Sequence, residues 1–386
     1  MDTGRPDQII RVLREAGYEA YYVGGCVRDH LLGRPIHDWD ITTSALPEQT
    51  MRCFDHCVPT GIKHGTVTVL LEHVTAEVTT FRADGAYSDA RHPDQVRFVR
   101  NLEEDLSRRD FTINAMAMDS EGRIIDLFGG REDLGRNLLR CVGDPETRFR
   151  EDALRMLRAL RFSAQLGFSL EEKTRQAISN CAHLCRELSV ERVRDEVEKT
   201  LLSEQPYRIE EMIELGLLQT GGAGHTQDYR WLGTLPKDRV IRWAGLCRII
   251  PQLDLLKMRL DKRTAVNAMT AGRCAAPKSP LEWRQLIAEY GSERARITAA
   301  LCGCSDDVEA LLSSGQCLSL KDLAVKGSDL TVLHGAAVGD MLRELLDHVL
   351  RHPEDNSKKK LLQIYEDRID SCYWMCYDTG NKKKEP

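Results

Sequence analysis

The sequence predicts an α+β protein, with a mixed α/β domain at the N-terminal end and an all-helical remainder. Alternating apolar and polar residues, the pattern typical of β-strands, recur among helical segments over roughly the first 130 residues. Beyond Thr147 the strand pattern nearly disappears, and apolar residues recur at the spacing of a helix. The chain has 386 residues, which is enough for two to three domains.

In the first domain, helical patterns cover 7–18 and 27–32. Ser44, which precedes a proline in the expected first turn, has the character of the N-cap of a further helix. Strands or buried core segments are expected at 20–23, 38–41, 66–72, 76–81, 96–99, 113–118 and 124–126, of which 66–72 and 76–81 form a hairpin. These elements make a mixed sheet with helices packed on it.

In the remainder, glycine, proline and serine separate the helical patterns. Residues 221–224 are a candidate linker, and short helices fill the chain beyond it. The helices before the linker are expected at 147–167, 171–187, 190–203 and 206–217.

Composition limits the classes of function. Hydrophobic residues make up 42% and charged residues 30%, and no apolar run is long enough to span a bilayer, so we expect no membrane segment and a cytoplasmic location. The N-terminus has no hydrophobic stretch of the kind found in signal peptides. The thirteen cysteines contain no CxxC pair, so free thiols in a reducing cytosol are favoured over a zinc site assembled across domains.

The net charge of −6 argues by itself against a nucleic-acid partner. Locally, however, basic residues are concentrated, because eight arginines lie between Arg131 and Arg161. An acidic protein with one basic face still attracts phosphates over a Debye length of about 8 Å. Lysine triplets at 358–360 and 382–384 are interpreted as solvated segments, the second more firmly than the first.

The first group of residues that carries chemistry is Gly24-Gly25 with Arg28, followed by Asp38 and Asp40. A glycine pair between strand and helix lets the backbone approach a triphosphate closely, and a helix N-terminus favours anions. Two aspartates two positions apart on a strand face the same side, which suits Mg²⁺ held by a few carboxylates and substrate phosphates. A lone DxD is usually a surface accident; beside the glycine pair and Arg28 it predicts a metal site.

Glu77, on the expected strand 76–81, is a candidate third carboxylate, because its neighbours Thr75 and Thr79 on the same face are polar. A solvent-facing glutamate on an edge strand is an equally good interpretation. The residue is therefore kept as a catalytic candidate with this alternative open.

The second group spans Arg108 to Asn114. Arginines such as Arg109 supply paired donors for phosphate oxygens, while Asp110 and Asn114 are suited to ribose hydroxyls. Two arginines at the start of a strand can equally be a charged surface.

The third group lies in the expected helix 147–167, where Asp152 and Arg155 are i,i+3 neighbours. A surface ion pair is the simple interpretation, but a carboxylate beside a guanidinium also matches the amino group and ring nitrogen shared by cytosine and adenine. Uracil and guanine present the reverse pattern and would leave both side chains mispaired. The pair thus predicts a site that accepts C and A without a template. Arg158 and Arg161 continue the series, and the helical drift of about 60° per step turns Arg161 away from Asp152, toward phosphate or RNA backbone.

These residues resemble the class II tRNA nucleotidyltransferases, the CCA-adding enzymes, in their compact bacterial form. The resemblance covers about 22–200 almost without gaps, and a weaker one lies at 323–330. Residues 220–310 carry no clear match. The matching motifs lie at 22–33, 38–45, 65–67, 103–117 and 151–162.

The resemblance implies a polymerase-β-like nucleotidyltransferase head, 1–146, followed by a helical neck, 147–204, body, 205–310, and tail, 311–386, with the tail binding tRNA. The implied reaction adds the 3′-terminal CCA to tRNA from CTP and ATP and releases pyrophosphate, with contacts to the 3′ end and acceptor stem. Asp38 and Asp40 would bind Mg²⁺. The implied nucleotide contacts are Gly25, Arg28, Arg109, Asp152, Arg155, Arg158 and Arg161.

Three alternatives remain. A poly(A) polymerase or a partial CC-adding or A-adding enzyme shares most of these motifs. The polar stretch 82–93 resembles a flexible loop that CC-only relatives lack, which favours the complete activity. A catalytically inactive RNA-binding adaptor would be expected to have lost the metal carboxylates, and both Asp38 and Asp40 are present.

Overall fold

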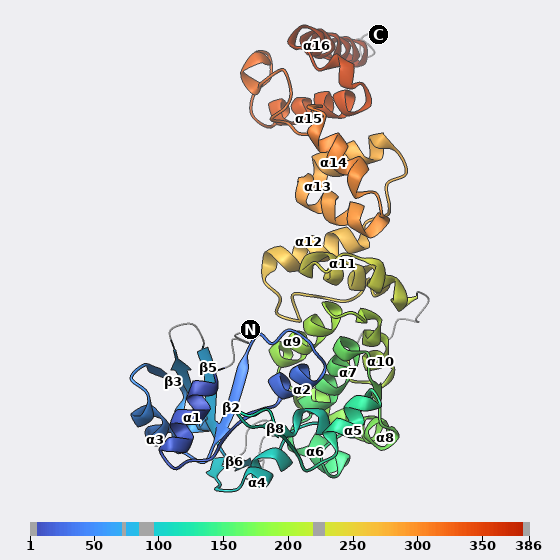
Figure 1. The fold of residues 1–386 in the computed structure, drawn as a ribbon. Helices are drawn as coiled ribbons and strands as arrows, with labels where there is room; N and C mark the ends of the chain where they lie inside the picture. Colours follow the sequence, from blue (N-terminus) through green and yellow to red (C-terminus); the bar gives the residue numbers. More distant parts are fainter. Residues whose placement is uncertain (1–5, 72–74, 85–95, 219–227, 381–386) are drawn as a thin grey trace. The chain divides into compact units, whose positions relative to one another are not determined.

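The computed structural model describes residues 6–71, 75–84, 96–218 and 228–380, and the chain divides into two compact units. The first consists of Met1–Thr234 with Lys257–Arg259, and the second of Leu235–Leu256 with Leu260–Pro386. In Figure 1 the strands before residue 130 are drawn from blue to cyan, and all the described strands belong to the first unit. No described helix is long and apolar enough to cross a membrane.

A seven-stranded mixed sheet forms the N-terminal part of the first unit, in the order β3-β4-β5-β2-β1-β8-β9. Only β2 and β5 pair in parallel within this sheet; the other neighbours are antiparallel. Two small sheets lie apart from it, β6 (Arg82–Asp84) with β7 (Val96–Phe98) and β10 (Leu138–Leu139) with β11 (Ser169–Leu170). The strands of the large sheet are β1 (Ala20–Val23), β2 (Trp39–Thr43), β3 (Cys57–Gly61), β4 (Thr66–Leu70), β5 (Thr75–Thr80), β8 (Met116–Met118) and β9 (Ile124–Asp126).

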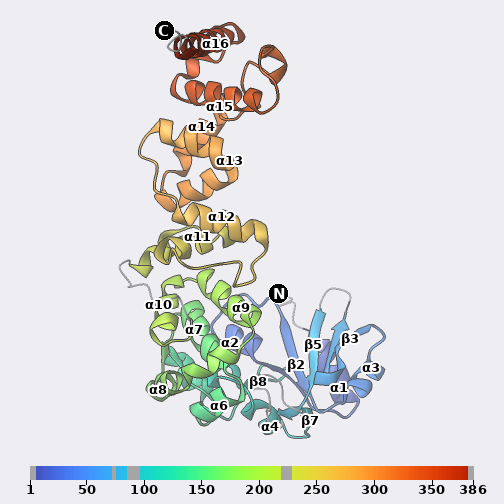
Figure 2. The same cartoon turned by 180° about the vertical axis from the view of Figure 1, so that it is seen from behind.

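Alternation along β1 separates the two faces of the sheet. Tyr22 points toward α1 (Asp7–Glu15), where its hydroxyl donates to Asp7 at 2.8 Å, and α1 also packs on α3 (Pro47–Cys53) (Figures 1 and 2). Val23 belongs instead to an apolar cluster with Leu102 and Leu106 of α4 (Leu102–Ser107). The two faces are therefore covered by different helices, and α4 serves the Val23 face.

The helices that follow the sheet complete the first unit. α7 packs against α9, and α6 packs against α8. Their bounds, with the others of this unit, are α2 (Gly25–Leu31), α5 (Gly130–Gly135), α6 (Pro145–Glu151), α7 (Leu154–Leu166), α8 (Glu172–Cys181), α9 (Val190–Leu201) and α10 (Ile209–Glu214).

The second unit is helical throughout its described residues and has its own apolar core, which includes Trp283, Leu345, Val349 and Leu361. Helix α13 of this unit is interrupted at Gly291, whose φ of 83° lies in the left-handed region that glycine adopts at little cost. The helices are α11 (Arg239–Ile249), α12 (Lys262–Arg273), α13 (Pro280–Cys302), α14 (Ser305–Ser313), α15 (Ala336–Arg351) and α16 (Lys358–Gly380).

Most of the expected strands and helices are present, and three expectations are wrong. The single helix 147–167 is two helices, because Asp152 has φ −145° and ψ 104° and its carboxylate accepts from the Leu154 N–H at 3.0 Å. Such a local side-chain bond competes with the helical backbone bonds. Ser44 is not the N-cap; α3 begins after Leu46, whose N–H donates to the Gln49 side chain at 2.8 Å.

The third difference is at 112–114, where a 3₁₀ turn, η2 (Thr112–Asn114), replaces the first part of the expected strand 113–118. The turn allows Asn114 to reach back to Asp110 at 3.1 Å. The candidate linker 221–224 lies outside the described residues. Most of the polar stretch 82–93 also lies outside them, although the first three residues of that stretch form β6.

Candidate active site

Asp40 lies at the second position of β2 and is half-buried, whereas Asp38 precedes the strand and is exposed. Glu77 of β5 is the parallel register partner of Asp40, so the two side chains share a face. Burial raises the pKa of Asp40, the Arg109 guanidinium lowers it, and the charges of Glu77 and Asp38 raise it further. The structure thus brings the three predicted carboxylates into one electrostatic cluster, centred on Asp40 with Arg109 beside it.

Gly24 lies next to two members of this cluster, Arg109 and Asp40. Its φ of 80° is in the left-handed region, and a Cβ added there would lie 3.0 Å from Nη1 of Arg109 and 3.8 Å from Oδ2 of Asp40. A Cβ on Gly25 would lie 3.6 Å from Nη2 of Arg28. Both glycines therefore keep side-chain atoms out of the space beside the arginines and carboxylate, as the sequence predicted for a close approach of the backbone to a ligand.

Asp105 of α4 holds strand β2 and Arg109 in place through hydrogen bonds. Its side chain is fully buried and accepts from Thr42 at 3.1 Å and Arg108 at 2.8 Å, and it receives a longer contact of 3.4 Å from Arg109. It also accepts from the main-chain N–H of Arg82 at 3.2 Å, where β6 begins. Burial opposes ionisation, but Arg108 and Arg109 outweigh it and lower the pKa of Asp105. One carboxylate therefore joins strand β2, Arg109 and the start of β6.

A second network joins the other predicted residues. Nη1 of Arg28 donates to Asn114 at 2.8 Å, Asn114 donates to Asp110 at 3.1 Å, and Arg158 donates to Asp110 through both Nε, at 2.9 Å, and Nη2, at 2.6 Å. Burial by itself would raise the pKa of Asp110, but Arg158 and the hydrogen bonds hold it at about 2. Asp110 thus links α2, η2 and α7 and is ionised at neutral pH.

Phe162 gathers three arginines on one ring. The guanidinium carbons of Arg28, Arg158 and Arg161 lie 5.3, 5.3 and 3.9 Å from its centroid, distances at which cations interact with an aromatic face. Arg161 is buried, and its Nε donates to Glu196 of α9 at 2.5 Å. The expectation that Arg161 turns away from Asp152 agrees with this contact, and its guanidinium is engaged within the protein rather than facing solvent.

Asp152 and Arg155 do not form the pair that a shared helix face would produce. Asp152 follows α6, and its carboxylate receives Nη2 of Arg192 at 2.8 and 3.1 Å. Arg155 is buried and donates to Glu151 at 2.5 Å and to the main-chain oxygen of Arg108 at 3.1 Å. The i,i+3 prediction failed because the break between α6 and α7 removes the shared face.

The carboxylates fit a divalent cation in number and charge. Asp40 and Asp38 repel each other at close range, which a cation between them would relieve. In the part of the chain that the structure describes, no group of three or more His, Cys, Asp or Glu side chains is gathered tightly enough to form a metal site alone. Two carboxylates suffice for Mg²⁺ when substrate phosphates and water complete its octahedron. The cysteines that the structure describes are all free.

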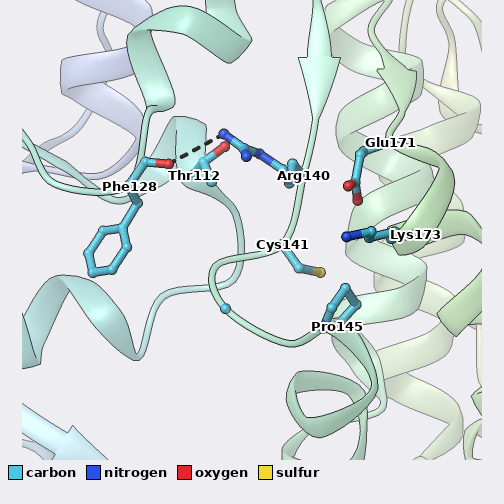
Figure 3. A pocket seen from close by; sticks show the side chains of 8 residues that line it. Thr112, Phe128, Arg140, Cys141, Pro145, Glu171 and Lys173 are labelled. Atoms are coloured by element: carbon cyan, nitrogen blue, oxygen red, sulfur yellow. Dashed lines mark hydrogen bonds between the residues drawn. The ribbon is translucent and has the colours of Figure 1, made fainter.

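A separate pocket of about 210 Å³ lies beside β10 and the start of α8 (Figure 3). Two of its charged groups have partners: Arg140 donates to Asp133 at 2.9 Å, and Glu171 caps α8 through the Thr174 N–H at 2.9 Å. None of the predicted site residues lines it. The residues around it are Thr112, Phe128, Arg140, Cys141, Gly143, Pro145, Glu171 and Lys173.

Sequence reasoning missed four residues that hold the site together: Asp105, Glu151, Arg192 and Glu196. Asp105 and Glu151 lie inside the quoted motifs, but their spacing gives no indication of partners. Arg192 and Glu196 are 40 and 35 residues from Asp152 and Arg161, and no local pattern connects such pairs.

Two family models match the chain, a Poly A polymerase head domain over residues 20–140 and a probable RNA and SrmB-binding site of polymerase A over residues 167–220. A CCA-adding enzyme of Geobacillus kaustophilus is 44% identical over 370 residues, 89% of this chain and 90% of the relative. One of Anoxybacillus flavithermus is 40% identical over 92% of this chain and 94% of the relative. The Bacillus stearothermophilus CCA-adding enzyme, solved in complex with CTP, matches with a TM-score of 0.82 and 36% identity, over 96% of this chain and 100% of that one.

Proposed function

Since the chain belongs to the CCA-adding enzymes, we propose that it builds and repairs the 3′-terminal CCA of tRNA from CTP and ATP, releasing pyrophosphate and using no template. The full-length similarity to relatives of this activity carries the proposal. The enzyme is a tRNA nucleotidyltransferase with a polymerase-β-like head, as its motifs predicted.

Enzymes of this family use divalent metal ions, and we propose Mg²⁺ on Asp38 and Asp40. When bound, the ion would neutralise the triphosphate and favour ionisation of the attacking 3′-hydroxyl. Glu77 is proposed as a third catalytic carboxylate, supported by its register with Asp40. Arg109, whose Nε is buried without a hydrogen-bond partner, is available to donate to a phosphate beside this cluster.

We assign the remaining nucleotide contacts to the two networks described above. Gly25 and Arg28 lie at the start of α2 and would face the triphosphate. Asp110 and Asn114 would orient the ribose, with Arg158 holding Asp110 ionised. Arg161 would act on the nucleotide through the shared Phe162 ring rather than by direct contact, because its guanidinium is engaged by Glu196.

For choice of base, we propose that the Asp152 carboxylate accepts the amino group of cytosine or adenine and repels the carbonyl oxygen of uracil or guanine. Arg155 remains the proposed donor to the ring nitrogen. Its Nη1 is hydrogen-bonded to Glu151 in the structure, and a guanidinium has further N–H donors that could serve the base. For Asp152 to accept the amino group of the base, Arg192 must leave one carboxylate oxygen available, since its Nη2 donates to both in the structure.

The proposed tRNA contacts lie in the helical parts, and the borders at 146, 204 and 310 remain predictions. The neck would carry base choice, and the tail, 311–386, would hold tRNA. With CTP, ATP and tRNA as partners and no described membrane-spanning helix, we propose a cytoplasmic location.

The alternatives differ in their products. A poly(A) polymerase extends RNA with many A residues, a CC-adding enzyme stops after two C, and an A-adding enzyme requires CC. The purified protein should therefore be incubated with tRNA that ends at the discriminator base, with CTP and ATP supplied together and separately. CTP alone should give a product two nucleotides longer, and both together a product three longer. A ladder of A residues, or arrest at CC with both nucleotides present, would refute complete CCA addition.

A further inference from the structure

Arg192 of α9 contacts the Asp152 carboxylate, and none of the motifs assigns it a role. Its Nη2 donates to both oxygens, at 2.8 and 3.1 Å, from a helix that begins 38 residues after Asp152. The two side chains are 21% and 19% exposed, so the contact is largely shielded from water. An ion pair shielded in this way is screened less than one at the surface.

The contact matters because Asp152 is poorly constrained by its own segment. It lies between α6 and α7, outside both helices, and its other described bond is to the Leu154 N–H at 3.0 Å. A carboxylate with one local bond can rotate about its side-chain torsions. Arg192 removes that freedom, since its own backbone is held in the first turn of a twelve-residue helix.

The guanidinium of Arg192 also has a donor that makes no hydrogen bond. Nη1 of Arg192 is buried without a hydrogen-bond partner, and Nη2 alone serves both carboxylate oxygens. A buried donor without an acceptor is unfavourable. The arrangement is therefore suited to a carboxylate that shifts to share its oxygens with an incoming donor while the arginine keeps contact through its second nitrogen.

We propose that Arg192 is a positioning residue for base selection: it holds the Asp152 carboxylate aimed at the base edge, and so sets the preference for CTP over UTP. This inference rests on the proposed role of Asp152. It gives Arg192 no contact with the reacting atoms. Loss of Arg192 should leave the carboxylate present but misdirected, so it should lower selectivity through Asp152 alone.

The test compares the CTP/UTP ratio of kcat/KM for single-nucleotide addition in six proteins: wild type, Asp152→Ala, Arg192→Met, Arg192→Lys, the double variant Asp152→Ala/Arg192→Met and the control Arg194→Met. Arg192→Met keeps the length of the side chain and removes its charge. Arg194→Met is the matched control, because Arg194 lies on the same helix but pairs with Asp195 and the main-chain oxygen of Arg259. Thermal melts verify that each variant is folded.

Arg192→Met should lower the ratio by roughly tenfold, Arg192→Lys should restore part of it, and Arg194→Met should leave it unchanged. In the Asp152→Ala background, Arg192→Met should have no further effect on the ratio, because it acts through that carboxylate. A purely structural role would lower Tm and rate with the ratio preserved.

Two results overturn the inference and are distinguishable. If Asp152→Ala lowers the ratio and folded Arg192→Met leaves it within twofold of wild type, or if the two losses simply add, Arg192 does not position Asp152 and base reading by Asp152 stands. If Asp152→Ala itself leaves the ratio unchanged, the proposed base reader is wrong and the role of Arg192 falls with it.

Discussion

Removing the charge of Asp110 should cost the first unit a measurable part of its stability. Asp110 is buried, accepts two hydrogen bonds from Arg158, at 2.9 and 2.6 Å, and has its pKa lowered from 3.8 to about 2. At about 1.4 kcal/mol per pH unit, that drop is worth roughly 2 kcal/mol of folding free energy. Asp110→Asn keeps the shape and an acceptor for Asn114 but loses this term and leaves Arg158 without its counter-charge.

Thermal unfolding of the nucleotide-free protein measures the effect. For a unit of this size, 1 kcal/mol shifts Tm by about 2–4 °C, so Asp110→Asn should lower the first transition by at least ~5 °C. The control Asp195→Asn breaks an exposed pair with Arg194 and should change Tm little. A double-mutant cycle with Arg158→Met should return a coupling of roughly 2 kcal/mol.

The stabilisation by ionised Asp110 should decrease as the pH is lowered. The pKa of Asp110 is lower in the folded state, so its stabilisation is fully present above the unfolded value of 3.8 and is lost as pH falls toward about 2. The Tm difference between wild type and Asp110→Asn should therefore be constant from pH 8 to about 5.5 and shrink below about pH 4. A difference under ~1 °C at neutral pH, or one that grows on acidification, would refute the ion-pair reasoning.

Three further predictions concern the carboxylate cluster. Asp40→Ala should abolish nucleotide addition and leave tRNA affinity in a filter-binding assay nearly unchanged, because phosphate contacts elsewhere dominate that affinity; near-normal turnover would contradict the metal assignment. Glu77→Gln should lower kcat by roughly tenfold or more at unchanged Tm if the residue is catalytic. A wild-type kcat would show that Glu77 is a solvent-facing strand residue without a catalytic role. Gly24→Ala should raise KM for CTP and ATP, since its Cβ would lie 3.0 Å from Arg109; Gly33→Ala, which also replaces a glycine of positive φ (64°) but has no atom within 4 Å, should leave KM unchanged.

The strand pattern was sufficient to predict β2, but the expectation that Asp38 and Asp40 both lie on this strand is wrong for Asp38, which precedes its first residue. Glu77 could be named but not placed, since its neighbour across the sheet depends on the parallel register of β5 with β2. The helical prediction failed at Asp152 for a local reason: apolar periodicity continues through the break, and the bond from its carboxylate to the Leu154 N–H decides the backbone there.

Long-range partners were beyond prediction for a different reason. Arg155 has an acidic neighbour at i−3 and another at i−4, and only the three-dimensional structure selects Glu151. Arg192 and Glu196 occupy positions on α9 that look like an ordinary charged surface, yet they contact Asp152 and Arg161. The sequence thus indicated candidate nucleotide contacts, but not the partners that hold them in place.

The joint between α4 and the helices after it has a consequence for how the protein can vary. Arg148 donates to the main-chain oxygen of Ser107 at 2.6 Å, and Arg155 to that of Arg108 at 3.1 Å. Every amino acid carries that carbonyl oxygen, so mutation at 107 or 108 changes the side chain without removing the acceptor. These two bonds therefore constrain the side chains at 148 and 155 but not those at 107 and 108; Arg108 is constrained instead by its hydrogen bonds to Asp105.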